Sequence, residues 1–457
     1  MSYALDLTEG QRPGHAVRTC LIGMRLGKML RLSPPDQSAL FYALLMKDLG
    51  CSSNAARFAA LFGSHDQDLK AQIKEIDWTR ALDAFRYVLR NVAPGQRLLT
   101  RTWRLLALMS HGHSEARDIV RTRCERGADI ARLIGLDAGT CEAIRSLDEH
   151  WDGQGQPYSR RGHEIPRLAR VLNLAQTVEV YVSSYGVLTA YDMAAARRGS
   201  WFEPALVDAL LSIPPTDQFW TNLATSGDLR ALTAIEPPDR VVVADDEQID
   251  SIAEGFARVI DAKSPWTYRH STGVAAIAVS IGTHMGWSAG ELRLLRRAAL
   301  LHDLGKLGVS NLILDKPARL SPEEFAVMRQ HTLHTAGILQ RVSCFRDLAD
   351  DAAGHHERLD GRGYHRGLVG RQIGRHARVL AVADICDALL ASRPYRAGLP
   401  PERVLDVMRR EAGGVIWAEA FLALEAVMNQ AAAAEHASDA PAAIQVAALA
   451  EDYNQAA

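Results

Sequence analysis

The stretch LLHDLGKLGVS, residues 300–310, ends an apolar run with a histidine beside an aspartate and places a lysine three positions after the aspartate. A helix over the apolar run would bring His302, Asp303 and Lys306 close together at its end, because about 3.6 residues make one turn. A neutral base, a carboxylate and a cation together suit the handling of a charged substrate. We therefore treat this stretch as the centre of the candidate site.

The apolar pattern around this stretch is helical nearly throughout the chain. One stripe at helical spacing consists of Val274, Ile277, Ala278, Ile281 and Met285. Ser321 and Glu324 have the spacing of a capping box, and Ser264 before a proline predicts another helix start. No convincing series of alternating strands is found, so the predicted fold class is all-α.

The first half of the chain contains a less complete copy of the same sequence motifs. LLMKDLG at 44–50 matches LLHDLGK at 300–306, and GHEIPRLARVLNLAQ at 162–176 matches GRQIGRHARVLAVAD at 370–384. DEHWDGQGQP also matches HHERLDGRGYH, and His15 precedes Lys47 by the same 32 residues that separate His270 from His302. Matches in one order predict a duplicated helical domain.

The repeats and the Pro-marked stretches SIPPTD and IEPPDR predict the domain organisation. We expect two tandem helical bundle domains, over residues 1–211 and 251–426, joined by a linker over 212–250. Residues 427–457 are rich in Ala and Gln, which predicts a surface helix or a frayed tail.

The composition excludes several classes of protein. Lys and Arg number 52 against 54 Asp and Glu, so a nucleic-acid coat is not expected and we expect no DNA or RNA partner. No apolar run is long enough to span a bilayer and no secretory leader is visible, so we expect no membrane association and a cytoplasmic location. The six cysteines lack CxxC spacing and predict reduced thiols.

Seven histidines and aspartates of the second half sit on or beside apolar stripes. They are His270, His302, Asp303, His331, His355, His356 and Asp384. Burying so many ionisable groups is costly unless they pair or bind a cation. Imidazoles with a few carboxylates suit iron, manganese or zinc, and seven ligands exceed one tetrahedral site. The set therefore predicts two divalent ions bridged by Asp303, although any one of these histidines could be an ordinary core residue.

The residues around these candidates indicate hydrolysis of a phosphate ester. A pair of ions lowers the pKa of a water and neutralises phosphate oxygens, and Lys306 could bind a non-bridging oxygen as charge builds up. His331 shares its predicted face with Val327, which places its side chain inward. Arg393 and Arg396 are either a phosphate clamp or ordinary surface arginines.

These motifs resemble the HD-GYP family, a branch of the HD-domain metal-dependent phosphohydrolases. The resemblance runs from about residue 252 to 424 and rests on HDLGK, HHERLDGRGYH and ADICDALLASRPYR. It implies an iron or manganese centre held by the seven residues above, and hydrolysis of cyclic di-GMP to pGpG, GMP or both. It also implies catalytic roles for Asp303 and Lys306 and substrate contacts by Tyr364, Arg393 and Arg396.

The chain departs from the family pattern at two places in the second half. Trp266 stands where trinuclear members have a ligating Glu, which favours two ions. The name-giving triplet reads Gly363-Tyr364-His365, with His in place of Pro. The resemblance implies a GGDEF-type protein partner that binds through this loop, and the chain departs from the family pattern there.

The first half resembles a degenerate copy of the same domain. His15 is retained, whereas Lys47, Arg123 and Gln176 stand where the second half has metal ligands, and Cys51 replaces the lysine. We expect this half to bind no metal and to perform no catalysis. Its expected roles are homodimer formation, sensing or support of the other half.

Three functions remain open from the sequence. Hydrolysis of cyclic di-GMP is the first, and the same chemistry on 3′,3′-cGAMP or another nucleotide is its near alternative. A catalytically silent scaffold that responds to nucleotide is the alternative of another class.

Overall fold

The structure is a computed structural model that describes residues 2–76, 81–93, 98–225, 230–237, 244–267, 269–392 and 397–437. Within these ranges the chain is helical, and its only β-type pairings are isolated bridges. The prediction of an all-α fold is confirmed. None of the helices in the described part of the chain is long and apolar enough to cross a membrane.

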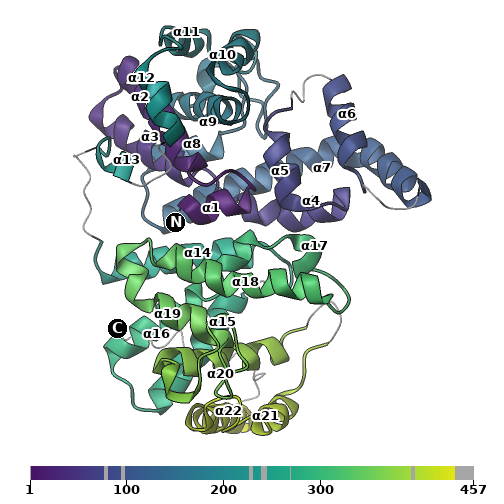
Figure 1. Ribbon diagram of the computed structural model, residues 1–457, viewed down its shortest axis with the longest axis vertical. Coiled ribbons are helices and arrows are strands. Elements are labelled where there is room, and N and C mark those ends of the chain that lie inside the picture. The colour runs from purple at the N-terminus through teal and green to yellow at the C-terminus, as the bar shows by residue number, and fades with distance from the viewer. Residues whose placement is uncertain are drawn as a thin grey trace. The chain divides into compact units, whose positions relative to one another are not determined.

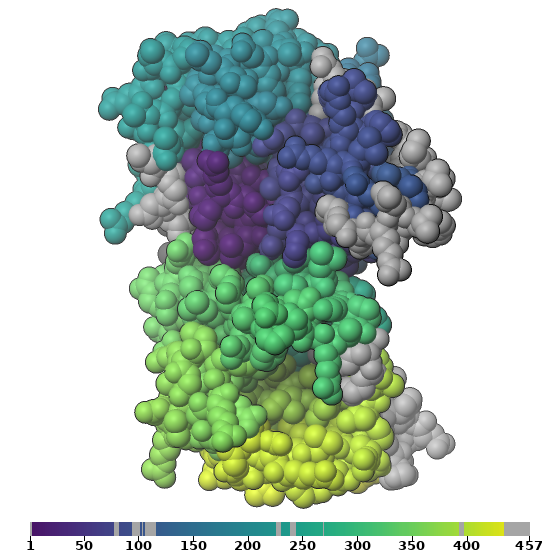
Figure 2. All heavy atoms as spheres, turned by 45° about the vertical axis from the view of Figure 1, so that its right-hand side comes forward, coloured from purple at the N-terminus to yellow at the C-terminus, as the bar shows by residue number. Residues whose placement is uncertain are grey.

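Two compact units divide the chain between Ser251 and Ile252, except that Ser310–Leu312 groups with the first unit. Figure 1 colours the N-terminal unit from purple to teal and the C-terminal unit from green to yellow. In the space-filling view, the green and yellow atoms of the C-terminal unit pack against one another (Figure 2). Each unit is described below by itself.

The N-terminal unit is built on α2, which packs against both α3 and α9. Its helices are α1 (Ser2–Thr8), α2 (His15–Met29), α3 (Pro34–Met46), α4 (Ala55–Phe62), α5 (Asp66–Ile73), α6 (Ala81–Asn91), α7 (Leu98–Leu133), α8 (Ala138–Arg145), α9 (Arg167–Tyr185), α10 (Val187–Ala196), α11 (Pro204–Leu211), α12 (Gln218–Thr225) and α13 (Arg230–Thr233). The 3-10 helices η1 (Cys51–Asn54) and η2 (Gly162–Glu164) lie between them. The expected linker, residues 212–250, contains α12 and α13.

The C-terminal unit repeats this packing, because α15 contacts α16 and α20 as α2 contacts α3 and α9. Its helices are α14 (Asp246–Asp261), α15 (His270–His284), α16 (Ala289–Leu301), α17 (Asn311–Leu314), α18 (Pro322–Leu339), α19 (Ala349–Ala353), α20 (Arg375–Leu390), α21 (Pro401–Arg409) and α22 (Ala418–Ala437), and α14 begins within the expected linker. The 3-10 helices are η4 (Leu304–Gly308), η5 (Ser343–Leu348), η6 (Gly354–His356) and η7 (Gly370–Gln372).

Two predicted helix starts have different outcomes. The capping box is confirmed, since Ser321 Oγ accepts from the Glu324 backbone at 3.2 Å and Glu324 returns a bond to the Ser321 backbone at 2.7 Å. The prediction that Ser264 caps a helix is wrong. The chain makes one further turn, closed by a bond from Thr267 N to the Ser264 carbonyl at 3.1 Å, and α15 begins at His270.

The packing of α18 and α22 corrects two further details. Val327 was expected to face inward with His331 but is 39% exposed, because α18 enters the packed interior only from His331 onward. The α22 helix continues into the expected tail as far as Ala437, with Val427 buried. Residues 438–457 lie outside the described part of the chain.

Candidate metal centre

His270 is the first residue of α15, and the local structure directs it into the C-terminal unit. Arg269 has a positive φ of 62° and turns the chain into the helix. Asp261 at the end of α14 accepts from the Ser271 backbone at 3.1 Å and from the Ser271 hydroxyl at 2.6 Å. Burial raises the pKa of Asp261 to about 6. A side chain from another helix thus caps α15 and holds its first turn in place.

His302 and Asp303 lie where α16 ends and η4 begins. Thr335 of α18 donates its hydroxyl to the His302 carbonyl at 2.9 Å and accepts from the Gly305 backbone at 2.8 Å. The absence of a side chain at Gly305 lets α18 pass directly against η4. This contact brings His331, one turn before Thr335, to the side of Asp303.

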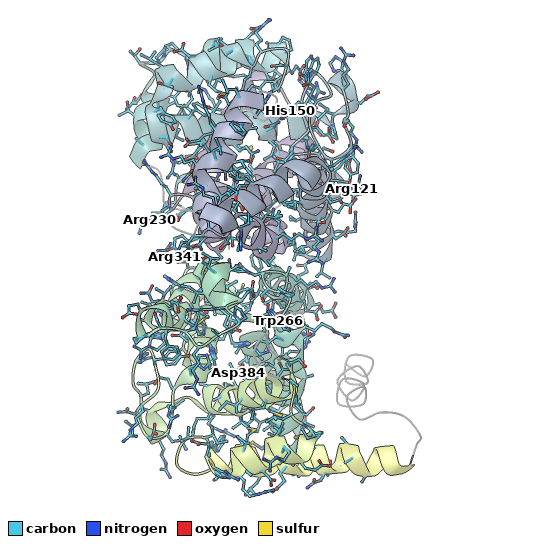
Figure 3. The ribbon with its side chains drawn as sticks, turned by 90° about the vertical axis from the view of Figure 1, so that its right-hand side faces the viewer. Arg121, His150, Arg230, Trp266, Arg341 and Asp384 are labelled. Atoms are coloured by element: carbon cyan, nitrogen blue, oxygen red, sulfur yellow. The ribbon has the colours of Figure 1, made fainter. Side chains whose placement is uncertain are left out.

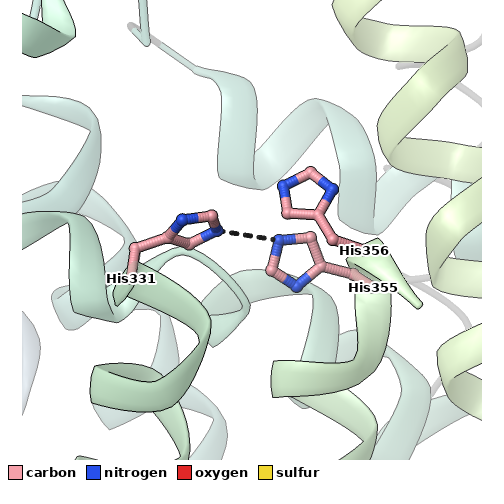
Figure 4. Close-up of side chains that lie close together, drawn as sticks. All are labelled: His331, His355 and His356. Carbon is pink, nitrogen blue, oxygen red and sulfur yellow. Dashed lines mark hydrogen bonds between the residues drawn. The ribbon is translucent and has the colours of Figure 1, made fainter. Parts of the chain in front are cut away.

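His355 and His356 end η6 and complete the histidine cluster. Figure 4 shows both rings beside His331, with 3.3 Å between the Nε2 atoms of His331 and His355. The ring centroids of His355 and His356 are 4.1 Å apart. Three imidazoles from α18 and η6 therefore gather at one place.

Asp303 lies between two groups of histidines and turns one carboxylate oxygen toward each. Its Oδ2 atom is 3.5 Å from His270 Nε2 and 3.3 Å from His302 Nε2. Its Oδ1 atom is 3.5 Å from His331 Nε2 and 3.7 Å from His355 Nε2. This is the geometry expected of a carboxylate that bridges two ions.

Asp384 of α20 closes the other side of the site, inside the C-terminal unit (Figure 3). Its Oδ1 atom lies 3.3 Å from His270 Nε2 and 3.8 Å from His302 Nε2, and its Oδ2 atom lies 3.9 Å from His356 Nδ1. The seven residues predicted from the sequence thus converge. Their ligand atoms form three overlapping groups that could hold a metal ion: His270, His302 and Asp384; His302, Asp303 and His355; and His331, His355 and His356.

Three of the imidazoles have a fixed orientation. The Nδ1 atoms of His302, His331 and His355 lie 2.6 to 2.7 Å from backbone carbonyl oxygens three residues earlier. A carbonyl oxygen only accepts, so each Nδ1 carries the proton and each Nε2 turns an unshared electron pair toward the centre. Backbone geometry therefore prepares these three rings as ligands.

The surroundings set the charge of each group. Burial lowers the pKa of His331 to about 3 and that of His356 to about 4, and it holds the pKa of His355 well below its usual range. Burial alone would raise the pKa of Asp303, but His302 and Lys306 outweigh it and hold that pKa well below the ordinary value. At neutral pH His331, His355 and His356 thus present neutral imidazoles and Asp303 a charged carboxylate, the forms that bind metal. The carboxylates of Asp303, Asp384 and Asp387 outweigh burial at His270 and raise its pKa.

The donor atoms fit a pair of cations. The Nε2 atoms of His331 and His355 face each other at 3.3 Å with both protons on the opposite nitrogens. The buried atoms His302 Nε2 and Asp303 Oδ1 make no hydrogen bond. Buried polar atoms without partners are costly, and cations between them would satisfy all four.

Lys306 lies beside the cluster, and Trp266 precedes His270 by four residues. Lys306 Nζ lies 2.5 Å from Asp303 Oδ2 and its side chain is partly exposed. The lysine is therefore within reach of a phosphate that approaches Asp303. Trp266, labelled in Figure 3, is 39% exposed, and its indole offers no metal ligand.

An aromatic surface leads outward from the histidines. The Tyr364 ring centroid lies 4.9 Å from that of His356 and 6.3 Å from that of Phe325. The guanidinium of Arg329 stands over both outer rings, 5.8 Å from Tyr364 and 5.4 Å from Phe325. We call Phe325, Arg329 and Tyr364 the aromatic platform. Phe325 and Arg329 were not predicted, because only the fold brings α18 beside the Tyr364 loop.

Two other predictions concern Arg393 and Arg396 and the loop with His365. Arg393 and Arg396 fall outside the described residues. The loop with His365 borders a shallow groove of about 380 Å³ that is lined by α18, Asp350, His365 and Arg366 and by none of the seven ligands. Binding of a partner protein through this loop remains a prediction.

The N-terminal copy has cations where the C-terminal copy has candidate metal ligands. Lys47 is buried and forms an ion pair with Asp48. Lys74 of the following segment lies 3.1 Å from Glu9 and 3.6 Å from Asp48. Glu9, Asp48 and Cys51 are close enough together to hold an ion, but both carboxylates are already paired with ammonium groups.

Arg123 and His15 complete this degenerate centre. Arg123 forms an ion pair with Asp148, which stands near the place of the His355–His356 pair. His15 Nε2 is buried without a hydrogen bond. Glu9 and Lys74 were not predicted, because they lie outside the motifs that the two halves share.

A protein-family model described as the HD domain matches residues 105–206 and 254–416, which together make up more than half of the chain. One match falls in each unit, as expected of a duplicated domain.

The chain is similar to curated bacterial enzymes. The 3′3′-cGAMP-specific phosphodiesterase 3 of Vibrio cholerae is 39% identical over 429 residues, which cover 94% of this chain and 93% of that protein. A cyclic di-GMP phosphodiesterase of Thermotoga maritima is 40% identical over 164 residues, which cover 35% of this chain and 45% of that protein. The crystal structure of a cyclic GMP-AMP specific phosphodiesterase of V. cholerae matches with a TM-score of 0.63 and 36% identity, covering 94% of this chain and 95% of that one.

Proposed function

We propose, on the premise that this chain belongs to the HD domain family, in its HD-GYP branch of metal-dependent phosphodiesterases, that it hydrolyses a cyclic dinucleotide at two divalent ions in its C-terminal unit. The observation that carries the proposal is the position of Asp303. One of its oxygens faces His270 and His302, and the other faces His331 and His355. A carboxylate in that position can hold two ions side by side.

Two groups of ligands would hold the ions, with Asp303 common to both. The first contains His270, His302 and Asp384, and the second contains His331, His355 and His356. When bound, the ions supply an activated water and neutralise charge on the phosphate. We propose iron or manganese, because the set combines imidazoles with carboxylates and contains no thiolate.

The other residues of the site would bind and orient the substrate. The aromatic platform offers two rings and a guanidinium for stacking a purine base. Lys306, within reach of Asp303, would bind a non-bridging phosphate oxygen as negative charge develops. Water adds to phosphorus, the bond to the 3′ oxygen breaks, and that oxygen leaves with a proton, so the product is a linear dinucleotide.

The favoured substrate is 3′,3′-cGAMP. The relative with that specificity matches this chain along nearly its whole length, N-terminal unit included. Cyclic di-GMP, which the motifs alone favoured, is the second candidate, because the T. maritima enzyme named for it matches about a third of this chain. Both candidates carry the same phosphodiester, so the choice between them depends on contacts with one base.

One purification and one assay test the proposal. The protein is isolated without oxygen, bound iron and manganese are counted, and 3′,3′-cGAMP and cyclic di-GMP are each tested for linear products. We expect two ions per chain and faster turnover of 3′,3′-cGAMP. Faster turnover of cyclic di-GMP would reverse the order of the two candidates. Bound metal without a product from any cyclic dinucleotide would favour the silent scaffold instead.

A further inference from the structure

His270 is held differently from the other imidazoles of the centre. Its Nδ1 atom lies 2.5 Å from Asp387 Oδ2, whereas His302, His331 and His355 direct Nδ1 to backbone carbonyls. Asp387 follows Asp384 by three residues on α20, so one helical turn supplies both a ligand and a partner for His270. Asp387 itself is not within the groups that could hold an ion.

The neighbouring helix leaves room for this carboxylate. A β-carbon at Gly273 of α15 would lie 2.4 Å from Asp387 Oδ1. Gly273 has an ordinary helical conformation and costs stability relative to alanine in a helix interior. Its presence is explained by the space that the Asp387 carboxylate needs to reach His270.

The N-terminal copy has an equivalent histidine–carboxylate pair, but an arginine neutralises the carboxylate. His15 Nδ1 contacts Glu179, which follows Gln176 by three residues as Asp387 follows Asp384. Arg18 follows His15 by three residues, as Gly273 follows His270, and its Nε donates to Glu179 Oε1 at 2.6 Å. The N-terminal copy, in which cations replace the candidate ligands, thus has an arginine bound to the carboxylate. The C-terminal copy, which has all seven candidate ligands, has a glycine at the equivalent position.

We infer that Asp387 is a positioning residue of the metal centre, which holds the proton of His270 on Nδ1 and strengthens Nε2 as a metal donor. The bond is almost shielded from water, since the side chains of His270 and Asp387 are 4% and 18% exposed. A carboxylate behind a ligating imidazole fixes its orientation and increases electron donation to the ion. Gly273 serves the same end, because any larger side chain would displace the carboxylate. The inference deepens the proposed function, since it rests on the two-ion centre.

Binding of Mn²⁺ to the full chain tests this role without reference to any substrate. Apparent affinity is measured by competition with a chelator, and ions per chain are counted. We expect Asp387→Asn to weaken Mn²⁺ binding about 10- to 100-fold, the range found for partners of metal-bound histidines. Asp387→Glu should bind more tightly than Asp387→Asn, because the N-terminal copy makes the same contact with a glutamate. High Mn²⁺ concentrations should restore the ions per chain of Asp387→Asn.

Two further variants make the test decisive. Glu179→Gln removes the matching carboxylate from the copy that lacks the ligands, and it should leave Mn²⁺ affinity unchanged. Gly273→Ala should weaken Mn²⁺ binding by displacing Asp387. This variant tests the role of Asp387 if Asp387→Asn does not fold. Wild-type Mn²⁺ affinity in a folded Asp387→Asn or Gly273→Ala protein would overturn the inference. Weakened binding without hydrolysis of any cyclic dinucleotide would uphold it and refute the proposed function alone.

Discussion

Gly305 lies so close to His331 that a β-carbon on the glycine would come within 1.9 Å of the His331 carbonyl oxygen. The N-terminal copy has the same relationship, since a β-carbon at Gly50 would come within 1.9 Å of the Arg123 carbonyl oxygen. The glycine is thus retained even where the ligands are lost. In each copy the glycine allows the long helix, α18 or α7, to pack directly against the segment that follows His302–Asp303 or Lys47–Asp48.

Substitution of Gly305 by alanine should therefore displace α18. Overpacking of this kind costs about 1–3 kcal/mol of folding free energy, and the shift would carry His331 away from Asp303. We expect Gly305→Ala to lower the ions bound per chain as well as the unfolding midpoint. Gly337→Ala on the same helix is the matched control, because a β-carbon there meets no atom within 4 Å and alanine favours the helix. Full metal content in Gly305→Ala would contradict the close packing.

The two copies should respond in opposite ways when the equivalent position is changed. His302→Ala and Asp303→Ala remove ligands and should lose both bound metal and turnover. Lys47→Met removes a buried ammonium beside Asp48 and should destabilise the protein by about 3–5 kcal/mol while bound metal stays unchanged. Metal analysis and chemical unfolding of all three variants check this. If Lys47→Met lost the metal and His302→Ala kept it, the roles of the two copies would be reversed.

The aromatic platform should contribute to substrate binding and not to the chemical step. Stacking of a base on an aromatic side chain is worth about 1–3 kcal/mol. We expect Phe325→Ala and Arg329→Ala each to raise KM about 5- to 150-fold with kcat and metal content near wild type. Val327→Ala is the control, because Val327 is 39% exposed on the same helix and offers no aromatic ring or charge for a base. An unchanged KM in both platform variants would place the base elsewhere.

The buried pair of His15 and Glu179 should give the N-terminal unit a dependence on pH. Burial alone would raise the pKa of Glu179, but His15 and Arg18 outweigh it and lower that pKa from 4.5 to about 2. The folded protein therefore keeps Glu179 charged at a lower pH than the unfolded chain does. Its contribution, about 3 kcal/mol, is fully present above pH 4.5 and disappears as the pH falls toward 2.

Chemical unfolding of wild type and Glu179→Gln at several pH values measures this contribution. The difference in unfolding free energy should be constant between pH 7 and about 5 and should shrink in more acid solution. A difference that grew on acidification would mean that Glu179 is not held in its charged form.

The candidate ligands could be selected from the sequence because they lie in short motifs of recognisable chemistry. His302 and Asp303 follow an apolar run, and His355 and His356 are adjacent. The platform and the partner of His270 were not predictable in this way. Phe325 and Arg329 read as ordinary surface residues of a helix, and Asp387 reads as one more polar residue after Asp384. Ser264 was misassigned because a turn and a helix cap use the same local residues.

The amino-acid sequence alone determined the all-α class, the duplication and the identity of the seven candidate ligands, since helical periodicity and residue chemistry are local properties of the chain. Only the tertiary structure decided that the two oxygens of Asp303 face different histidines, that Asp387 supports His270, and that ammonium groups fill the degenerate centre. These relationships join residues far apart in the chain. They depend on close approaches that need glycine, because a β-carbon at Gly50 or Gly305 would collide with a neighbouring backbone and one at Gly273 with the Asp387 carboxylate.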